Sequence, residues 1–278
     1  MNIEAMSLME LAPFAAGLIV TGLVAGVLAG LLGVGGGIVI VPVLYHVFTL
    51  LGIDEAVRMH LAVGTSLGTI VLTSIRSVRA HAKKGAVDWP MLKSWALPIL
   101  LGVAAGTVVA AYVSGDALTG VFASIALLVA ANLAFGKESW RLGTQLPGKP
   151  VQYSVAGVIG TLSALMGIGG GTFAVSFMTL YGKNPREAVA TSSGLGVLIA
   201  VPAVTGFVWA GWNDPLLPPF SFGYVNLIGI ALIAPLSVLA APWGAAIAHA
   251  ISPKALIRAF AAFLALTSVQ MFYRLFFG

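Results

Sequence analysis

The sequence contains no cysteine, and only 8% of its 278 residues are charged. Without cysteine the chain can form neither disulfide bonds nor thiolate metal sites. Ordinary soluble domains carry roughly 25% charged residues, whereas this chain has nine acidic and fourteen basic residues and is 59% hydrophobic. So few charges cannot cover the outside of a soluble protein. A bilayer removes that requirement, because lipid solvates an apolar exterior. The composition therefore predicts an integral membrane protein.

The sequence also lacks the residue patterns of catalytic sites. It has no HExxH motif, no pair of acidic residues at membrane depth and no recognisable Ser–His–Asp set. Hydrolysis and metal chemistry therefore find no support, and we predict neither an enzyme nor a cofactor. The net charge of +5 does not indicate nucleic-acid binding, because the basic residues lie in short loops between apolar runs. The positive-inside bias of membrane proteins accounts for them.

Ten apolar runs, separated by glycine, proline or charged residues, predict an all-α fold. They cover residues 11–32, 38–51, 61–80, 92–114, 118–135, 151–166, 172–182, 188–210, 223–247 and 255–276. A membrane-spanning helix needs about 20 residues, and the runs 38–51 and 172–182 are shorter. Both follow a glycine cluster. We therefore expect two half-helices that continue a broken span or line an internal cavity.

An internal repeat organises these runs. The segment GLLGVGGGIVIVPVL at 30–44 is matched 134 residues later by ALMGIGGGTFAVSFM, and AVGTSL at 62–67 is matched by AVATSS at 188–193, with a first-half loop that is eight residues longer. Five segments per half is an odd number, so the second half would be inserted upside down, as in many secondary transporters. We predict two inverted repeats of about five segments each, 1–135 and 151–278, with helices broken at paired GxGGG motifs and joined by a cytoplasmic linker at 136–150.

The loop charges predict the topology. If all ten segments cross the membrane, twelve of the fourteen basic residues fall on one side, and only Arg58 and Arg274 fall on the other. The positive-inside rule favours this arrangement, with both termini outside. The alternative has eight crossing helices, with the runs 38–51 and 172–182 as re-entrant loops.

The glycine clusters are the predicted substrate site. Three consecutive glycines exceed what helix packing needs, and each costs a helix about 1 kcal/mol relative to alanine. Unwound backbone explains them better, because free N–H groups at the start of a half-helix attract an anion. Close helix packing is the simpler alternative. The candidate substrate-binding glycines are Gly33, Gly35, Gly36, Gly37, Gly167, Gly169, Gly170 and Gly171.

Matched hydroxyl residues follow both clusters and are further candidates for substrate binding. A hydroxyl donates to an oxyanion without adding charge, although such side chains also bond back to carbonyls of their own helix. The candidates are Thr65, Ser66, Thr191, Ser192 and Ser193.

His46 is a candidate for proton or substrate coupling, because an ionisable group at membrane depth is a functional candidate by default. It has no counterpart in the second half, where Leu180 takes its place.

The linked motifs resemble those of a known family. GLLGVGGGIVIVPVL, AVGTSL and KKGAVDW at 83–89, followed by MGIGGGTF and AVATSS, are similar to the signature of the TauE/SafE sulfite and organosulfonate exporter family, of the toluene-sulfonate uptake permease type. The resemblance covers nearly the whole chain. It implies a multi-pass secondary carrier of small sulfur-containing anions, such as sulfite or sulfonates, in the bacterial inner membrane.

The implied partners are a small anionic substrate and the lipid bilayer, with a homo-oligomer left open. A passive anion channel and a carrier of non-sulfur organic acids are the alternatives, whereas a membrane enzyme is not expected.

Overall fold

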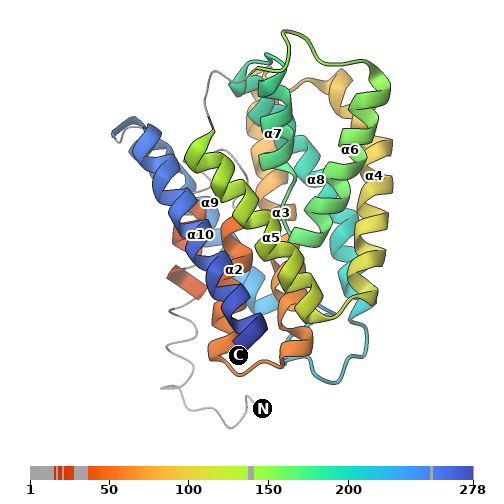
Figure 1. Cartoon of the computed structure of the whole chain (residues 1–278), viewed down its shortest axis with the longest axis vertical. Coiled ribbons are helices and arrows are strands. Elements are labelled where there is room, and N and C mark those ends of the chain that lie inside the picture. The colour runs from red at the N-terminus through yellow and green to blue at the C-terminus, as the bar shows by residue number, and fades with distance from the viewer. Residues whose placement is uncertain are drawn as a thin grey trace.

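The computed structural model describes residues 16, 18–20, 22–27, 37–136, 141–250 and 253–277, and this part of the chain is helical almost throughout (Figure 1). Its long helices are α2 (Gly37–Leu50), α3 (Glu55–Lys83), α4 (Trp89–Tyr112), α5 (Gly115–Phe135), α6 (Lys149–Met166), α7 (Gly171–Leu180), α8 (Pro185–Ala210), α9 (Leu227–Ala250) and α10 (Pro253–Phe277). The predicted all-α class is confirmed. By length and composition, α3, α4, α5, α8 and residues 257–277 of α10 are each able to cross a membrane.

Polar caps explain where several of these helices begin. The carboxylate of Asp54 accepts the N–H of Ala56 at 2.9 Å, and the Ser114 hydroxyl accepts the N–H of Ala117 at 3.2 Å. Each cap satisfies one of the amides that a helix leaves free at its start. Asp54 explains why α3 begins at Glu55, six residues before the apolar run predicted at 61–80.

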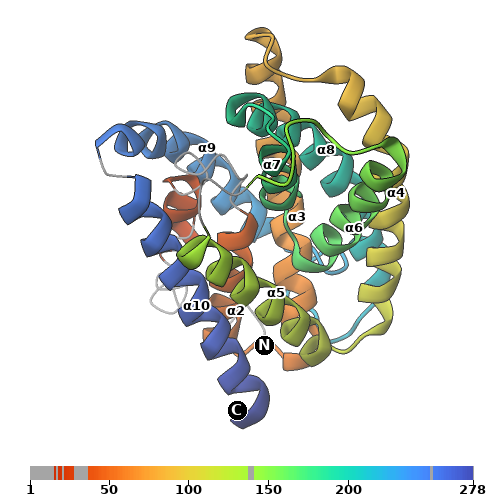
Figure 2. The same cartoon turned by 45° about the horizontal axis from the view of Figure 1, so that its top comes forward.

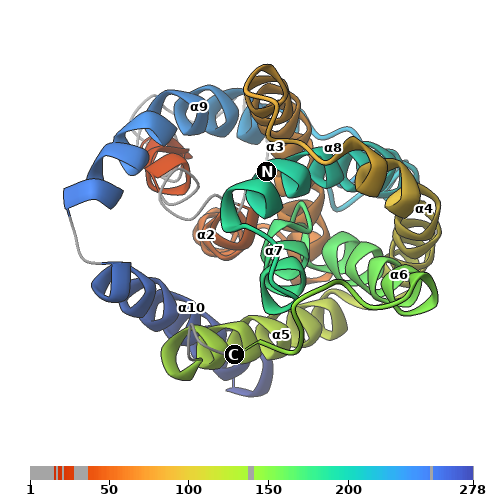
Figure 3. The same cartoon turned by 90° about the horizontal axis from the view of Figure 1, so that it is seen from above.

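The central helix is α3. Every residue from Val57 to Ile70 is buried, as expected for a helix that is covered on all sides. In the view from above, α3 lies among α2, α7 and α8 (Figure 3). The pair α4 and α6 packs at one edge of the fold, and α5 and α10 pack side by side at the other (Figure 1 and Figure 2).

Helices α6 and α7 form a hairpin whose outer ends lie on the same side of the fold (Figure 1). The indole N–H of Trp95 donates to Gln152 in the first turn of α6 at 3.1 Å. The ring of Trp95 also packs on Phe177 in the last turn of α7, with centroids 5.7 Å apart. One side chain thus contacts the entry and the exit of the hairpin.

Whether the runs 151–166 and 172–182 each cross the membrane, or the second is re-entrant, stays a prediction. Helix α6 has 18 residues and α7 has 10, which correspond to lengths of about 27 Å and about 15 Å. The chain turns back at the glycines between the two helices, so the pair enters and leaves at one end.

The basic loops gather at this end. The N–H of Leu142 in the linker donates to the carbonyl of Leu180 at 2.8 Å, and Lys183 forms an ion pair with Asp88 in the α3–α4 loop. The three loops that contain residues 84–88, 141–148 and 181–184 are thus in contact with one another. Which side of the membrane they face remains a prediction.

The sequence matching had suggested a longer loop in the first half. The structure shows that the eight additional residues lie in helices instead. Helix α2 is four residues longer than α7, and both end in a two-residue turn whose second residue is a left-handed glycine. From the cap Asp54 to the matched Thr65 are eleven residues, whereas from the cap Asn184 to the matched Thr191 are seven. The insertion is therefore one extra helical turn in each of α2 and α3.

Candidate functional site

The chain is unwound between α6 and α7. Helix α6 ends at Met166, and Gly167 follows with φ +65°. Gly170, with φ +70°, precedes the first residue of α7. Two left-handed residues within four positions favour glycine, because any other residue meets a steric penalty there. The second glycine cluster is therefore the place where the helix breaks.

The last residue of the first glycine cluster contacts this break. Gly33, Gly35 and Gly36 lie outside the described residues, but Gly37 is the buried first residue of α2. A Cβ added to Gly37 would lie 2.9 Å from the carbonyl oxygen of Gly167. The start of α2 and the α6–α7 break are thus in direct backbone contact in the interior, where only glycine fits.

The first amides of α7 have no hydrogen-bond acceptor within the described part of the chain. Ala174 donates its N–H to the carbonyl of Gly170 at 2.9 Å, whereas the N–H groups of Gly171, Thr172 and Phe173 have no acceptor among the described residues. Such a helix start carries roughly half a positive elementary charge. In a buried position it attracts an anion.

Three hydroxyl groups lie on or near the residues of this helix start. Ser163 of α6 is fully buried, and its Oγ has no hydrogen-bond partner in the described structure. That oxygen lies 3.3 Å from the position of a Cβ on Gly170. The Oγ1 of Thr172 is also buried and has no partner within the described ranges, and the Oγ of Ser74 in α3 lies 3.9 Å from the Cβ position of Gly169. We call these hydroxyls, together with the amides of residues 171–173, the break site.

The described residues that surround the break site are apolar and uncharged. Ile159 and Ile199 lie beside Gly170, and Ile70 lies beside Gly169. Among the described residues Arg58 is the only buried lysine or arginine, and its guanidinium donates to the carbonyl of Ile53 at 2.7 and 3.1 Å. Within the described residues, the polar groups of the break site are therefore backbone dipoles and hydroxyls. The described residues contain no cluster that is able to hold a metal ion.

Of the hydroxyls predicted from the sequence, Ser66 reaches the break. It donates to the carbonyl of Gly167 at 2.7 Å, so its proton holds the unwound backbone in place. Ser192 and Ser193 instead donate to carbonyls three residues earlier in α8. These two serines therefore bond back to their own helix, which is the alternative to substrate binding that the sequence left open.

The matched threonines form matched bonds between the two halves. The Oγ1 of Thr65 accepts the N–H of Asn226 at 2.9 Å, and the Oγ1 of Thr191 accepts the N–H of Asp88 at 3.0 Å. Asn226 and Asp88 both cap the helix that follows them, α9 and α4 respectively. Each threonine therefore holds the start of a long helix from the other half.

One of these caps also belongs to an ion-pair cluster. Lys183 pairs with Asp88 and, at 3.2 Å, with Glu187. Burial raises the pKa of Asp88, but the hydrogen bonds from Lys183 and from the N–H of Met91, with the charge of Lys183, outweigh it and hold the pKa below its usual value. Asp88 is therefore ionised at neutral pH.

His46 does not reach the break site. It lies nine residues after Gly37 in α2, which is about 14 Å along the helix axis. Its Nε2 is buried without a partner in the described structure, and its ring lies edge-on to Tyr45, with centroids 5.8 Å apart.

A second buried histidine lies in α3. The side chain of His60 is buried, and its Nε2 donates to the carbonyl of Ala110 at 2.9 Å. Its ring lies 4.8 Å from that of Tyr224, whose hydroxyl donates to Asp214 at 3.0 Å. The pKa of Tyr224 is raised to about 12, mainly because the side chain is partly buried and also because its hydroxyl bonds to the Asp214 carboxylate.

Matching the two halves could not have identified Ser163 and Thr172. The corresponding first-half positions hold Ala29 and Ile38, so no repeated hydroxyl marks them. The only available signal was their location within one helical turn of the second glycine cluster.

Comparison with known proteins places the whole chain among membrane transporters. The model of the family described as sulfite exporter TauE/SafE matches residues 18–271. A probable membrane transporter protein of Haemophilus influenzae is 32% identical over 257 residues, which cover 92% of this chain and 97% of that protein. The probable membrane transporter protein YunE of Bacillus subtilis is 30% identical, with 92% and 96% covered. A probable membrane transporter protein of Methanocaldococcus jannaschii is 29% identical, with 85% and 87% covered. No solved structure matches the chain.

Proposed function

Because the chain belongs to the sulfite exporter TauE/SafE family of membrane transporters, we propose that it is a secondary carrier of a small anion, sulfite or a small sulfonate, across the bacterial inner membrane. The break site is the observation that carries this proposal. It offers unpaired amides and buried hydroxyls to a ligand, and in the part of the chain that the structure describes it contains neither an acid nor a base.

The chemistry of the break site suits an oxyanion. Sulfite and sulfonates present several oxygens around one sulfur, and each oxygen accepts hydrogen bonds from N–H and O–H groups. The amides of Gly171 and Thr172 follow Gly170 at the start of α7, and the hydroxyl of Ser163 in α6 lies 3.3 Å from the Cβ position of Gly170. Fixed dipoles attract the charge of the anion without a full countercharge, which favours release as well as binding.

The proposed carrier consists of two inverted repeats, residues 1–135 and 151–278, whose glycine clusters meet at the substrate. Three observations support this architecture. Gly37 contacts Gly167, α2 and α7 end in the same kind of turn, and Thr65 and Thr191 make equivalent bonds across the halves. In transporters of this plan, one repeat rocks against the other around a central site.

Counterflow in proteoliposomes tests this function. Vesicles preloaded with unlabelled sulfite should take up labelled sulfite faster than empty vesicles, because a carrier exchanges substrate across the membrane. Thiosulfate, small sulfonates and carboxylates inside the vesicles then rank the substrates. A passive channel would show no acceleration by internal substrate, and counterflow of a labelled carboxylate without counterflow of labelled sulfite would identify a carrier of non-sulfur acids.

A further inference from the structure

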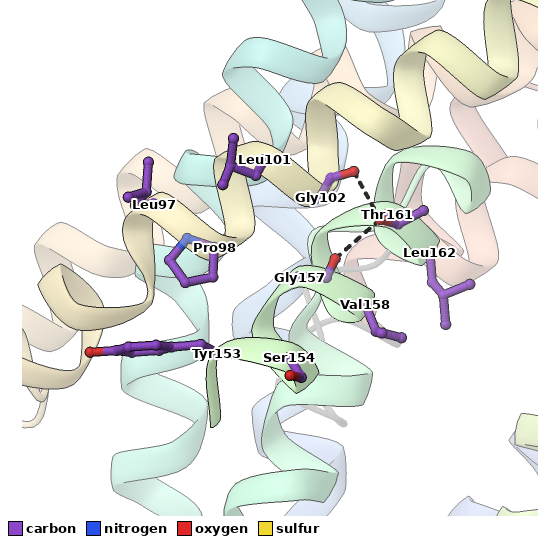
Figure 4. Close-up of a pocket in the computed structure, with 10 residues that line it drawn as sticks. All are labelled: Leu97, Pro98, Leu101, Gly102, Tyr153, Ser154, Gly157, Val158, Thr161 and Leu162. Atoms are coloured by element: carbon purple, nitrogen blue, oxygen red, sulfur yellow. Dashed lines mark hydrogen bonds between the residues drawn. The ribbon is translucent and has the colours of Figure 1, made fainter. Parts of the chain in front are cut away.

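An apolar groove runs along the outside of the fold between α4 and α6 (Figure 4). It has a volume of about 590 Å³, and none of the residues that line it is charged. Leu97 and Leu101 form one wall, and Val158 lies on the other. All three side chains are more than half exposed. In a membrane protein this surface faces acyl chains.

The floor of the groove is backbone, which makes its shape rigid. A Cβ on Gly102 would lie 2.0 Å from the carbonyl oxygen of Gly157, so α4 and α6 touch backbone to backbone there. The hydroxyl of Thr161 donates to the carbonyls of Gly102 and Gly157 at 3.0 and 3.1 Å. Small residues permit this close approach, and the larger side chains on either side form the walls of a preformed groove.

The end of the groove nearest the basic loops is polar and positively charged. There Ser94 donates to the hydroxyl of Tyr153 at 3.2 Å. Lys93 lies one turn before Leu97 on α4, and Lys149 lies one turn before Tyr153 on α6, so each lysine extends one wall of the groove. Both lysines are exposed, and neither forms a salt bridge within the described residues.

We propose that this groove is a binding site for one anionic phospholipid, whose acyl chain lies along the groove and whose phosphate lies between Lys93 and Lys149. Charge complementarity identifies the occupant, because basic pockets at the cytoplasmic ends of membrane helices bind anionic headgroups. A second copy of the chain is a poorer partner, since a two-fold contact would bring each lysine toward a like charge. The proposal is independent of which anion the protein carries.

Lipid titration followed by native mass spectrometry of the purified, detergent-solubilised protein tests the headgroup contact. Phosphatidylglycerol should bind more tightly than phosphatidylcholine of the same chain length. In the Lys93→Gln/Lys149→Gln variant, the Kd for phosphatidylglycerol should rise about fivefold for each lysine removed. The matched control is Lys84→Gln/Arg186→Gln, which removes two exposed basic residues of the neighbouring loops and should leave the Kd unchanged.

A second variant tests the acyl-chain contact. A Cβ on Gly157 meets only the carbonyl oxygen of Pro98, at 3.7 Å, so Gly157→Leu fills the groove without forcing the helices apart. It should weaken phosphatidylglycerol binding severalfold. Gly120→Leu is the control, because its Cβ meets only Leu275, at 3.5 Å, at the other edge of the fold.

Three results would overturn the proposal: equal affinity for the two lipids, equal effects of the lysine variant and its control, or a lipid-free dimer in which Gly157→Leu disrupts the contact. Equal lipid binding by the Gly157→Leu and Gly120→Leu variants would overturn the placement of the acyl chain.

Discussion

The Oγ1 of Thr191 accepts the backbone N–H of Asp88 across 103 residues of sequence, at 3.0 Å. The same bond recurs between Thr65 and Asn226 at 2.9 Å. Both bonds anchor the start of a long helix from one half to a buried helix of the other. The first bond is partly buried and the second is fully buried, so the energetic cost of breaking them should differ.

Replacing either threonine by valine should destabilise the fold, because an amide of a helix cap loses its acceptor. Thr65→Val should cost about 1–3 kcal/mol, the range for an unsatisfied buried donor, and Thr191→Val should cost less. Thermal unfolding in detergent measures both. Serine at either position retains the acceptor and serves as the control. Equal stability of the valine and serine variants would contradict the role of these bonds.

The Asp88–Lys183 pair should hold the basic loops together over the whole physiological pH range. The pKa of Asp88 is lowered from its ordinary value of 3.8, so the resulting stabilisation is present above that value and is lost only as pH falls through the lower, folded-state pKa. Asp88→Asn should therefore be less stable than the parent between about pH 5 and pH 8, with a constant difference that shrinks only below about pH 4. A difference that varies between pH 5 and pH 8 would contradict this account.

His46→Gln should shift or flatten the pH profile of transport while some transport persists. The imidazole is half-buried in α2, its Nε2 has no partner within the described structure, and it lies away from the break site. Initial rates of sulfite uptake across a pH series measure the effect. If the rate and the profile both equal those of the parent, His46 is a packing residue.

Where the structure describes the chain, the sequence was sufficient to predict the helices and the place of the second break. Apolar runs matched the helices closely, because a membrane helix must be apolar along most of its length. The start of α3 was missed, since Glu55 and Arg58 interrupt the apolar pattern. These two side chains pair with each other at 3.2 Å, so the helix tolerates both.

The hairpin of α6 and α7 could not be predicted from the charges. Two short helices that cross in succession and two that fold back at the break both return the chain to its starting side. Lys183 therefore lies beside the linker in either case, and the positive-inside rule does not distinguish them. The bonds of Thr65 and Thr191 were equally hidden, because a hydroxyl in a helix does not reveal its partner.

Removing the hydroxyl of Ser163 should lower substrate affinity without lowering stability. A fully buried hydroxyl that has no partner among the described residues contributes no hydrogen bond to the fold, so Ser163→Ala should unfold at the same temperature as the parent or slightly higher. The loss of one hydrogen bond to a charged ligand should weaken sulfite binding about tenfold. Ser268→Ala is the control, because Ser268 in α10 is also fully buried and has no partner among the residues that the structure describes. Equal affinity of the two variants would exclude Ser163 from the site.

The affinity of Gly170→Ala for sulfite tests the anion site at the break most directly. A Cβ at this position would lie 2.4 Å from Ile199 and 3.3 Å from the Ser163 hydroxyl, on a residue with φ +70°. Gly85→Ala has the same left-handed strain, with φ +65° and no atom within 4 Å of the added Cβ, so it reports the backbone penalty alone, about 1–2 kcal/mol. Both proteins should remain folded in detergent, and a binding isotherm should show sulfite affinity reduced about tenfold or more in Gly170→Ala and unchanged in Gly85→Ala. Parental affinity in folded Gly170→Ala would contradict the anion site at the start of α7.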